Sequence, residues 1–150
     1  MISVFRLSSS RFPVNSGHGA AIHGGRWNPP GTEAIYAAQT ASLAALEILA
    51  HYSILPKDFV LTEIRIPENL TIVTVEPESL PIGWDSPIAI PQTQRLGKSW
   101  ASGNQSAILS VPSSIIPAER NFLLNPAHPD FAQILFQTPV PFRFDPRLKP

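Results

Sequence analysis

One carboxylate, Glu47, lies in the middle of an apolar stretch that runs from Ile35 to Tyr52. Thr40 can act as an N-cap, and the good helix formers that follow reach Pro56 without a glycine or proline, which predicts a helix. An apolar helix is usually buried on most sides, so we expect Glu47 to point into protein or a cleft. Such a carboxylate is either a structural group paired with an arginine or backbone, or an active-site acid.

A candidate anion-binding residue, Arg26, directly follows the doublet Gly24-Gly25 in "SGHGAAIHGGRWNPPG". Glycine lets backbone approach a ligand closely, and an arginine on such a loop suits bidentate contact with a phosphate or carboxylate. Arg26 is also the obvious partner for Glu47, and the two roles can coexist. The stretch lacks G-x-G-x-x-G spacing and a following lysine, which argues against a Rossmann or P-loop protein.

The other reactive side chains show no spacing of a known site. The four histidines lack metal-ligand spacing, so we expect no metal site. A triad of Ser113, His128 and Asp130 can be drawn, but Ser113 is not in a G-x-S-x-G elbow and the spacing carries no information. Four aromatic side chains are candidates either for stacking on a flat ring or for the core: Trp27, Tyr36, Trp84 and Trp100.

The composition indicates what kind of protein contains these candidate site residues. The 150 residues are 43% hydrophobic and 15% charged, which predicts one globular domain over residues 1–150. The formal net charge of +0 argues against direct nucleic-acid binding, and the lack of cysteine excludes disulfides and thiol chemistry. A membrane span and a secretory signal are not recognisable, so we expect a soluble, cytoplasmic protein.

The pattern along the chain predicts an α+β fold, with many short strands and one long early helix. The 17 prolines favour short strands and ordered loops. Residues 8–33, 77–92 and 118–131 read as loop or irregular structure. Residues 59–66 and 70–76 read as a hairpin or as adjacent strands, and residues 93–101 as a short helix. The remaining strands are expected at residues 2–7, 34–38, 106–111 and 132–144.

Three stretches together resemble the RES-domain family, which is named for an Arg, a Glu and a Ser. They are "GGRWNPPGTEAIYAAQTASLAALEILAH", "TQRLGKSWA" and "ILSVPSSIIPAERNFLLNPAHPDF". The family's three residues correspond here to Arg26, Glu47 and Ser113. Further motifs are Tyr36, eleven residues before Glu47, and Val-Pro-Ser before Asn-x-Leu-Leu-Asn-Pro-x-His-Pro. The resemblance spans nearly the whole chain.

The resemblance implies a fold similar to ADP-ribosyltransferases, with a central, mostly antiparallel, split β-sheet and few helices. It further implies the toxin of a bacterial toxin–antitoxin pair, which consumes NAD+ as substrate and needs no separate cofactor. The implied partner is a Xre-type helix-turn-helix antitoxin that covers the active-site cleft and makes any DNA contact. A homodimer within that complex is left open.

The resemblance and the chemistry of NAD+ cleavage together give the expected catalytic residues. Breaking the nicotinamide N-glycosidic bond passes through an oxocarbenium-like transition state, which the carboxylate of Glu47 would stabilise. Arg26 would bind the pyrophosphate, and Ser113 would hydrogen-bond the ribose or the carboxamide. The acceptor is expected to be water or inorganic phosphate.

The expected substrate-binding residues are Arg6 for the pyrophosphate, Tyr36 for stacking on the nicotinamide ring, and Asn121 for orientation. Two alternatives stay open. The first is ADP-ribosyl transfer to a protein, although no Gln/Glu-x-Glu pair precedes Glu47, where Ala45 and Leu46 stand. The second is a non-catalytic module that binds only the antitoxin.

Overall fold

Eight strands form one sheet in the computed structural model, which describes residues 1–149. The strand order is β4-β5-β6-β2-β1-β3-β7, and β8 also pairs with β3. Only β4 and β5 are parallel among these described pairs. The strands are β1 (Ile2–Ser9), β2 (Ile35–Ala38), β3 (Phe59–Ile66), β4 (Ile72–Thr74), β5 (Ile108–Pro112), β6 (Arg120–Leu124), β7 (Leu135–Phe136) and β8 (Val140–Phe142). The expected α+β class and mostly antiparallel sheet are confirmed.

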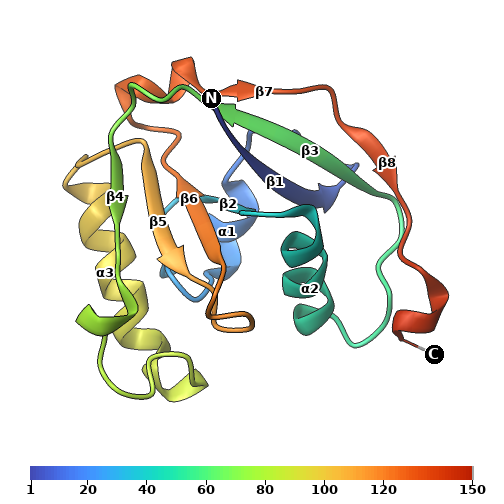
Figure 1. Cartoon of the computed structure of the whole chain (residues 1–150), viewed down its shortest axis with the longest axis horizontal. Helices are drawn as coiled ribbons and strands as arrows, with labels where there is room; N and C mark the ends of the chain where they lie inside the picture. Colours follow the sequence, from blue (N-terminus) through green and yellow to red (C-terminus); the bar gives the residue numbers. More distant parts are fainter. Residues whose placement is uncertain (150) are drawn as a thin grey trace.

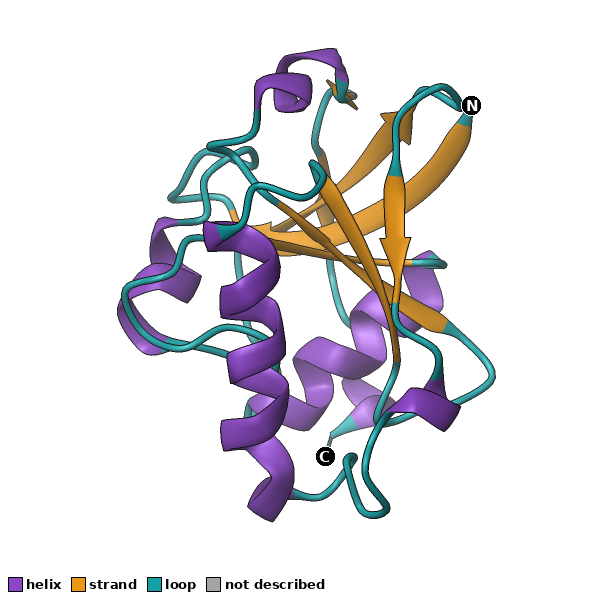
Figure 2. Cartoon of the chain, turned by 90° about the vertical axis from the view of Figure 1, so that its left-hand side faces the viewer, coloured by secondary structure: helices purple, strands orange, loops and turns teal. Residues whose placement is uncertain are grey.

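Three α-helices accompany the sheet in the described part of the chain: α1 (His18–His23), α2 (Ala41–His51) and α3 (Ile90–Ser102). Four short 3-10 helices lie at Pro77–Ser79, Pro87–Ala89, Pro129–Gln133 and Pro146–Leu148. Figure 1 shows α3 beside β4 and β5, and α2 below β1 and β3. The second view shows how strongly the strands fan out from one another (Figure 2).

The sheet divides between β1 and β2. These strands share one register pair, Phe5 opposite Ala38, whereas β1 and β3 are paired along eight residues and β2 and β6 along four. We call this division the seam. The seam agrees with the expected split sheet, and it leaves most of the facing backbone edges of β1 and β2 without strand pairing.

The long early helix forms as the sequence predicts. The Thr40 hydroxyl accepts a hydrogen bond from the Leu43 N–H at 3.0 Å and donates one to Glu119 at 2.9 Å. Leu43 is buried, but Leu46 and Ala50 are exposed. The expectation that α2 is buried on most sides is therefore wrong, because only one side of it packs on the sheet.

Residues 118–131 were expected to be irregular, but they contain β6, which lies between β5 and β2. Its Phe122, Leu123 and Leu124 are all buried. A strand buried on both faces has no alternation of polar and apolar residues, which removes the usual strand signal. The neighbouring turn signals at Asn125-Pro126 and His128-Pro129 lie just beyond it.

The expected pairing of residues 59–66 with 70–76 is also wrong. Both edges of β3 are occupied, by β1 on one side and by β7 and β8 on the other. Strand β4 instead pairs in parallel with β5 at the opposite end of the sheet. Two helices also fall partly or wholly in stretches expected to be loops, α1 within residues 8–33 and the first turn of α3 within 77–92.

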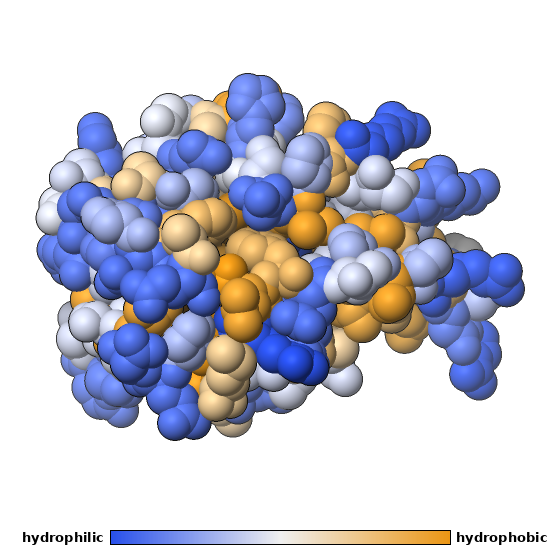
Figure 3. Space-filling model, turned by 90° about the horizontal axis from the view of Figure 1, so that it is seen from above, coloured by the Kyte–Doolittle hydropathy of each residue, from blue (hydrophilic) through white to orange (hydrophobic). Residues whose placement is uncertain are grey.

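The face formed by β1, β3, β7 and β8 is partly apolar. Seen from above, apolar atoms run along its middle between polar margins (Figure 3). Exposed large apolar residues on these strands include Ile2, Leu135 and Val140. No helix of the described chain is long and apolar enough to cross a membrane.

Candidate functional site

A cleft of about 780 Å³ opens at the seam. Its walls come from β1, β2, α2, the loop around Arg26, and residues 84–90, which we call the rim segment. Five of the six expected site residues line it: Arg6, Arg26, Tyr36, Glu47 and Asn121. Residues far apart in the sequence therefore share one cavity of a size typical for small-molecule ligands.

Glu47 is held in this cleft by two neutral donors. Its Oε2 accepts a hydrogen bond from the side-chain amide of Asn121, and the Ser113 hydroxyl lies 3.5 Å from the same oxygen. No arginine or lysine pairs with Glu47 among residues 1–149. The carboxylate is thus fixed through one oxygen, its other oxygen is left for a ligand, and it is not the partner of Arg26.

Ser113 lies behind the cleft wall and is fully buried. Its Oγ accepts hydrogen bonds from the N–H groups of Ile115 at 3.1 Å and Ile116 at 3.0 Å, which closes the turn after β5. The hydroxyl proton is then free to point at Glu47. In this geometry Ser113 contacts Glu47 and its own turn, and its expected contact with the ribose or the carboxamide stays a prediction.

The triad drawn from the sequence is not assembled. His128 uses its Nδ1 to accept a hydrogen bond from the backbone N–H of Asp130 at 3.0 Å. Ser113 contacts Glu47 and its own turn instead. A serine-hydrolase interpretation therefore has no support in the geometry.

The Arg26 guanidinium reaches across to the rim segment. Its Nη1 donates to the backbone carbonyls of Trp84 at 3.1 Å and Ser86 at 3.2 Å. Its Nε and Nη2 have no hydrogen-bond partner among the described residues and remain available to an anion. The rings of Trp27 and Trp84 lie 5.9 Å apart, which adds an apolar contact between the same two segments.

The loop that carries Arg26 is docked directly on α3. Gln94 donates to the carbonyl of Gly25 at 2.8 Å, and Thr93 donates to the carbonyl of Arg26. A Cβ built at Gly97 would lie 1.6 Å from the carbonyl oxygen of Trp27, so only glycine permits this close approach. The position of Arg26 is therefore set by a helix that begins 64 residues later, at Ile90.

Tyr36 is fixed in the cleft wall by its hydroxyl group. The hydroxyl donates to Asn28 Oδ1 at 2.6 Å and accepts from the Trp27 N–H at 3.1 Å. Burial raises the pKa of Tyr36 above its usual value, so the phenol stays neutral. Asn28 is buried and donates hydrogen bonds to the carbonyls of Ala20 and Thr32. It supports Tyr36 but was not among the expected site residues, although it stands in the quoted stretch "GGRWN".

Arg6 has fewer hydrogen bonds than Arg26, the other arginine in the cleft. Its Nη1 donates to the Tyr36 carbonyl at 2.9 Å across the seam, while its Nε is buried without a partner. No carboxylate of the described chain lies within ion-pair distance of it. Burial alone lowers the pKa of Arg6 to about 10. A buried, still charged guanidinium of this kind is suited to receive an anionic ligand.

Two histidines and an aspartate, His23, His51 and Asp85, also line the cleft and were not among the expected site residues. His51 follows Glu47 by four residues on α2, a spacing that places both on one helix face and could have been noticed. Asp85 has no comparable signal. Within residues 1–149, no group of three or more His, Cys, Asp or Glu side chains is arranged to hold a metal ion.

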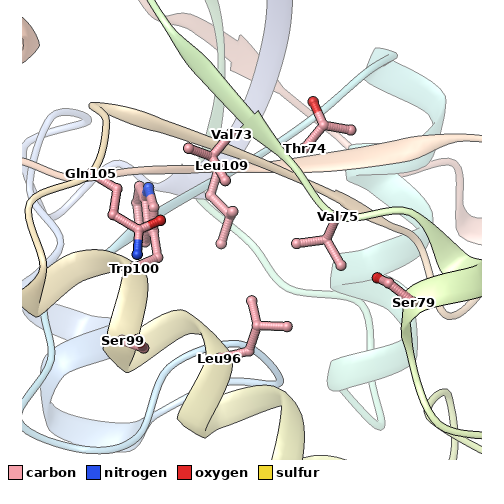
Figure 4. A pocket seen from close by; sticks show the side chains of 9 residues that line it. All are labelled: Val73, Thr74, Val75, Ser79, Leu96, Ser99, Trp100, Gln105 and Leu109. Atoms are coloured by element: carbon pink, nitrogen blue, oxygen red, sulfur yellow. The ribbon is translucent and has the colours of Figure 1, made fainter.

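A second, smaller hollow of about 280 Å³ lies between β4 and α3 (Figure 4). Val73, Val75, Leu96 and Leu109 give it an apolar lining. The indole N–H of Trp100, also in its wall, is already donated to Ser106 Oγ at 2.9 Å. This hollow shares no residue with the cleft that contains Glu47.

Known proteins are similar to this chain, in sequence or in fold, over nearly its whole length. The model of the RES domain family matches residues 3–145. "Toxin Res" of Yersinia enterocolitica is 40% identical over 151 residues, covering 97% of this chain and 99% of that protein. The "Prs ADP-ribosylating toxin" of Sphingobium sp. is 40% identical over 137 residues, covering 89% of this chain and 85% of that protein.

The fold is similar to that of a chain in the crystal structure of the M. tuberculosis MbcT–MbcA toxin–antitoxin complex. The TM-score is 0.74 at 20% identity, with 98% of this chain and 86% of that chain covered. The protein is thus an α+β chain with a RES-type fold and a polar cleft at the seam of its sheet. It belongs to the RES domain family.

Proposed function

We propose that the chain is the toxin of a toxin–antitoxin pair and degrades NAD+ by cleaving the nicotinamide N-glycosidic bond. The observation that carries this proposal is the state of Glu47. One carboxylate oxygen is held by Asn121 and approached by Ser113, and no cation of the described chain neutralises it. The same cleft contains two arginines with unused N–H groups, Arg6 and Arg26.

In the proposed reaction, the bond between ribose C1′ and the nicotinamide nitrogen breaks and its electron pair leaves with nicotinamide. The ribosyl carbon gains positive charge, which the free oxygen of Glu47 stabilises. An acceptor oxygen then bonds to C1′ and loses its proton. Asn121 and Ser113 keep the carboxylate from turning away, so little reorganisation is needed as the charge develops.

The other cleft residues bind the substrate in this proposal. The N–H groups left free on Arg26 and Arg6 contact the diphosphate. The ring of Tyr36, held by Asn28, stacks on the flat cationic nicotinamide. NAD+ is the substrate and no separate cofactor is required, because its positively charged base is already a good leaving group.

Water or inorganic phosphate is the proposed acceptor. Protein ADP-ribosylation is a second candidate, supported by the name of the Sphingobium relative, "Prs ADP-ribosylating toxin". The proposed partner is a Xre-type helix-turn-helix antitoxin, which would bind DNA for the pair, since this chain has a formal net charge of +0. The proposed location is the cytoplasm, where NAD+ is available, and homodimer formation within the complex is compatible with this scheme.

The test is NAD+ consumption by the purified chain freed of antitoxin, with and without phosphate, with products resolved by chromatography. Free nicotinamide with ADP-ribose or ADP-ribose 1″-phosphate supports cleavage and names the acceptor. A parallel reaction with labelled NAD+ and host proteins tests transfer. Folded protein that consumes no NAD+ in any of these reactions would refute the enzymatic proposal.

A further inference from the structure

Asp85 is a carboxylate in the cleft that the proposed mechanism does not use. It lines the cleft and is exposed. It forms no ion pair or side-chain hydrogen bond with any described residue, unlike Asp145, which binds Arg147, and Asp130, which accepts from Gln133. Its backbone has no left-handed φ angle that would favour an aspartate, unlike that of Asp58. The fold therefore gives no structural reason for a carboxylate at this position.

The backbone on both sides of Asp85 is tied to Arg26. The carbonyls of Trp84 and Ser86 both accept hydrogen bonds from Arg26 Nη1, at 3.1 and 3.2 Å. Asp85 lies between these two carbonyls and is therefore held next to the guanidinium without pairing with it. Its distance from the Arg26 site cannot change much while these two hydrogen bonds persist.

The order of the groups along a dinucleotide determines which group of the substrate can contact Asp85. With the nicotinamide ribose at Glu47 and the diphosphate at the free N–H groups of Arg26, the next group along the substrate is the adenosine ribose. Asp85 also lines the cleft and stands between the two residues whose carbonyls bind Arg26, so a ribose that adjoins a diphosphate bound at Arg26 comes within its reach. A carboxylate accepts hydrogen bonds from a ribose diol and repels a phosphate on it.

We propose that Asp85 binds the hydroxyl groups of the adenosine ribose and excludes dinucleotides that carry a 2′-phosphate, so that the cleft selects NAD+ over NADP+. This inference rests on the proposed function, because it takes the substrate to be a nicotinamide dinucleotide. A 2′-phosphate adds about −1.5 to −2 charges at neutral pH. Placed beside Asp85, it meets repulsion that weakens with ionic strength.

The test compares the wild-type chain with Asp85→Asn, the charge-keeping Asp85→Glu, and Glu78→Gln. Glu78 is a matched control, since it is exposed on the neighbouring 3-10 helix and does not line the cleft. Two readouts are used: kcat/KM for NAD+ and NADP+, and calorimetric binding of ADP-ribose and 2′-phospho-ADP-ribose. Melting curves accompany each variant.

The wild-type chain is expected to prefer NAD+ over NADP+, and ADP-ribose over 2′-phospho-ADP-ribose, by about tenfold or more, because like charges brought close together repel. Asp85→Asn should reduce the preference by about tenfold, while Asp85→Glu and Glu78→Gln keep it. The wild-type preference should also shrink in high salt. A wild-type chain that accepts both dinucleotides equally, or an Asp85→Asn variant with unchanged preference, overturns the inference.

The two readouts separate this inference from the proposed function. If NAD+ is consumed but the preference for NAD+ over NADP+ is the same in the Asp85 variants, only the role of Asp85 is refuted. If ADP-ribose binds with a preference that depends on Asp85 but NAD+ is not consumed, only the proposed catalysis fails. A chain that consumes no NAD+ and binds neither ADP-ribose nor 2′-phospho-ADP-ribose overturns both.

Discussion

Two partly buried arginines show how differently the two sides of the seam use the same side chain. Arg120, at the start of β6, donates from Nε to Ser110 Oγ at 2.6 Å and from Nη2 to the carbonyls of Val75 and Ser110. Its Nη1 lies 3.8 Å from Glu76. Arg6, on β1, has one hydrogen bond, to the Tyr36 carbonyl, and a buried Nε without a partner.

Arg120 finds most of its hydrogen-bond acceptors within the fold, whereas Arg6 at the cleft finds only one. Arg120 joins the ends of β4, β5 and β6, and its Nε and Nη2 donate hydrogen bonds within the fold. An unpaired buried donor such as Arg6 Nε costs free energy, so Arg6 contributes less to the stability of the fold than Arg120 does. The comparison separates an arginine that joins strands of the sheet from one that lines the cleft.

The largest expected effect is on turnover. It comes from comparing a carboxylate in the cleft, Glu47, with one outside it, Glu119. Glu47→Gln removes the charge from the cleft with little change in volume, and we expect kcat for NAD+ to fall by about 10²–10³-fold. The matched control is Glu119→Gln, because Glu119 accepts a hydrogen bond from Thr40 and does not line the cleft. Unchanged turnover in Glu47→Gln would remove Glu47 from the mechanism.

The next effect is on stability. Arg120→Met leaves the carbonyl of Val75 and the side chain of Ser110 without this donor, and we expect the free energy of unfolding to fall by about 2–4 kcal/mol. Denaturant unfolding measures this loss. At a temperature where the variant stays folded, its affinity for ADP-ribose should equal that of the wild type. A large loss of affinity without a loss of stability would reverse the roles given to the two arginines.

The smallest expected effect on stability is that of Arg6→Met. Burial lowers the pKa of Arg6 to about 10, below its value in the unfolded chain. The charged form therefore destabilises the fold at every pH below about 10, and this cost is relieved only as the pH rises further. We expect Arg6→Met to change the free energy of unfolding by no more than about 1 kcal/mol, because the lost hydrogen bond and the relieved charge burial offset each other.

The same variant should lose ligand-induced stabilisation. At pH 7, saturating ADP-ribose is expected to raise the melting temperature of the wild type, by an amount that follows ligand mass action. In Arg6→Met this increase should largely disappear, while Arg120→Met should retain it. An equal increase in both variants would show that the cleft does not use Arg6 for anions.

Local features of this fold were predictable from the sequence, and long-range ones were less so. Helix α2 and its Thr40 cap follow from neighbouring residues, and the family motifs brought Arg26, Glu47 and Asn121 to one site. The pairing of β4 with β5 was not predictable, because strand register depends on which edges other segments leave open.

The missed contacts in the site are of two kinds. The partners of Arg26 are backbone carbonyls of Trp84 and Ser86, and a carbonyl is present at every residue, so it gives no sequence signal. The inward hydrogen bond of Ser113 depends on a turn that forms only when its N–H groups converge on the hydroxyl. The family motifs pointed to residues that the fold brings together, but they did not reveal that Arg26 and Glu47 line the cleft while Ser113 lies behind its wall.

The order in which the strands join the sheet has a consequence for synthesis of the chain. From β1 to β2, from β2 to β3, from β3 to β4 and from β6 to β7, the polypeptide passes from one side of the seam to the other. Neither side is a continuous segment, so neither can be completed by a growing chain on its own. A nascent polypeptide that has not yet reached β6 lacks Asn121, the donor that fixes Glu47, and the strand on which β2 pairs. The complete cleft therefore appears late in translation.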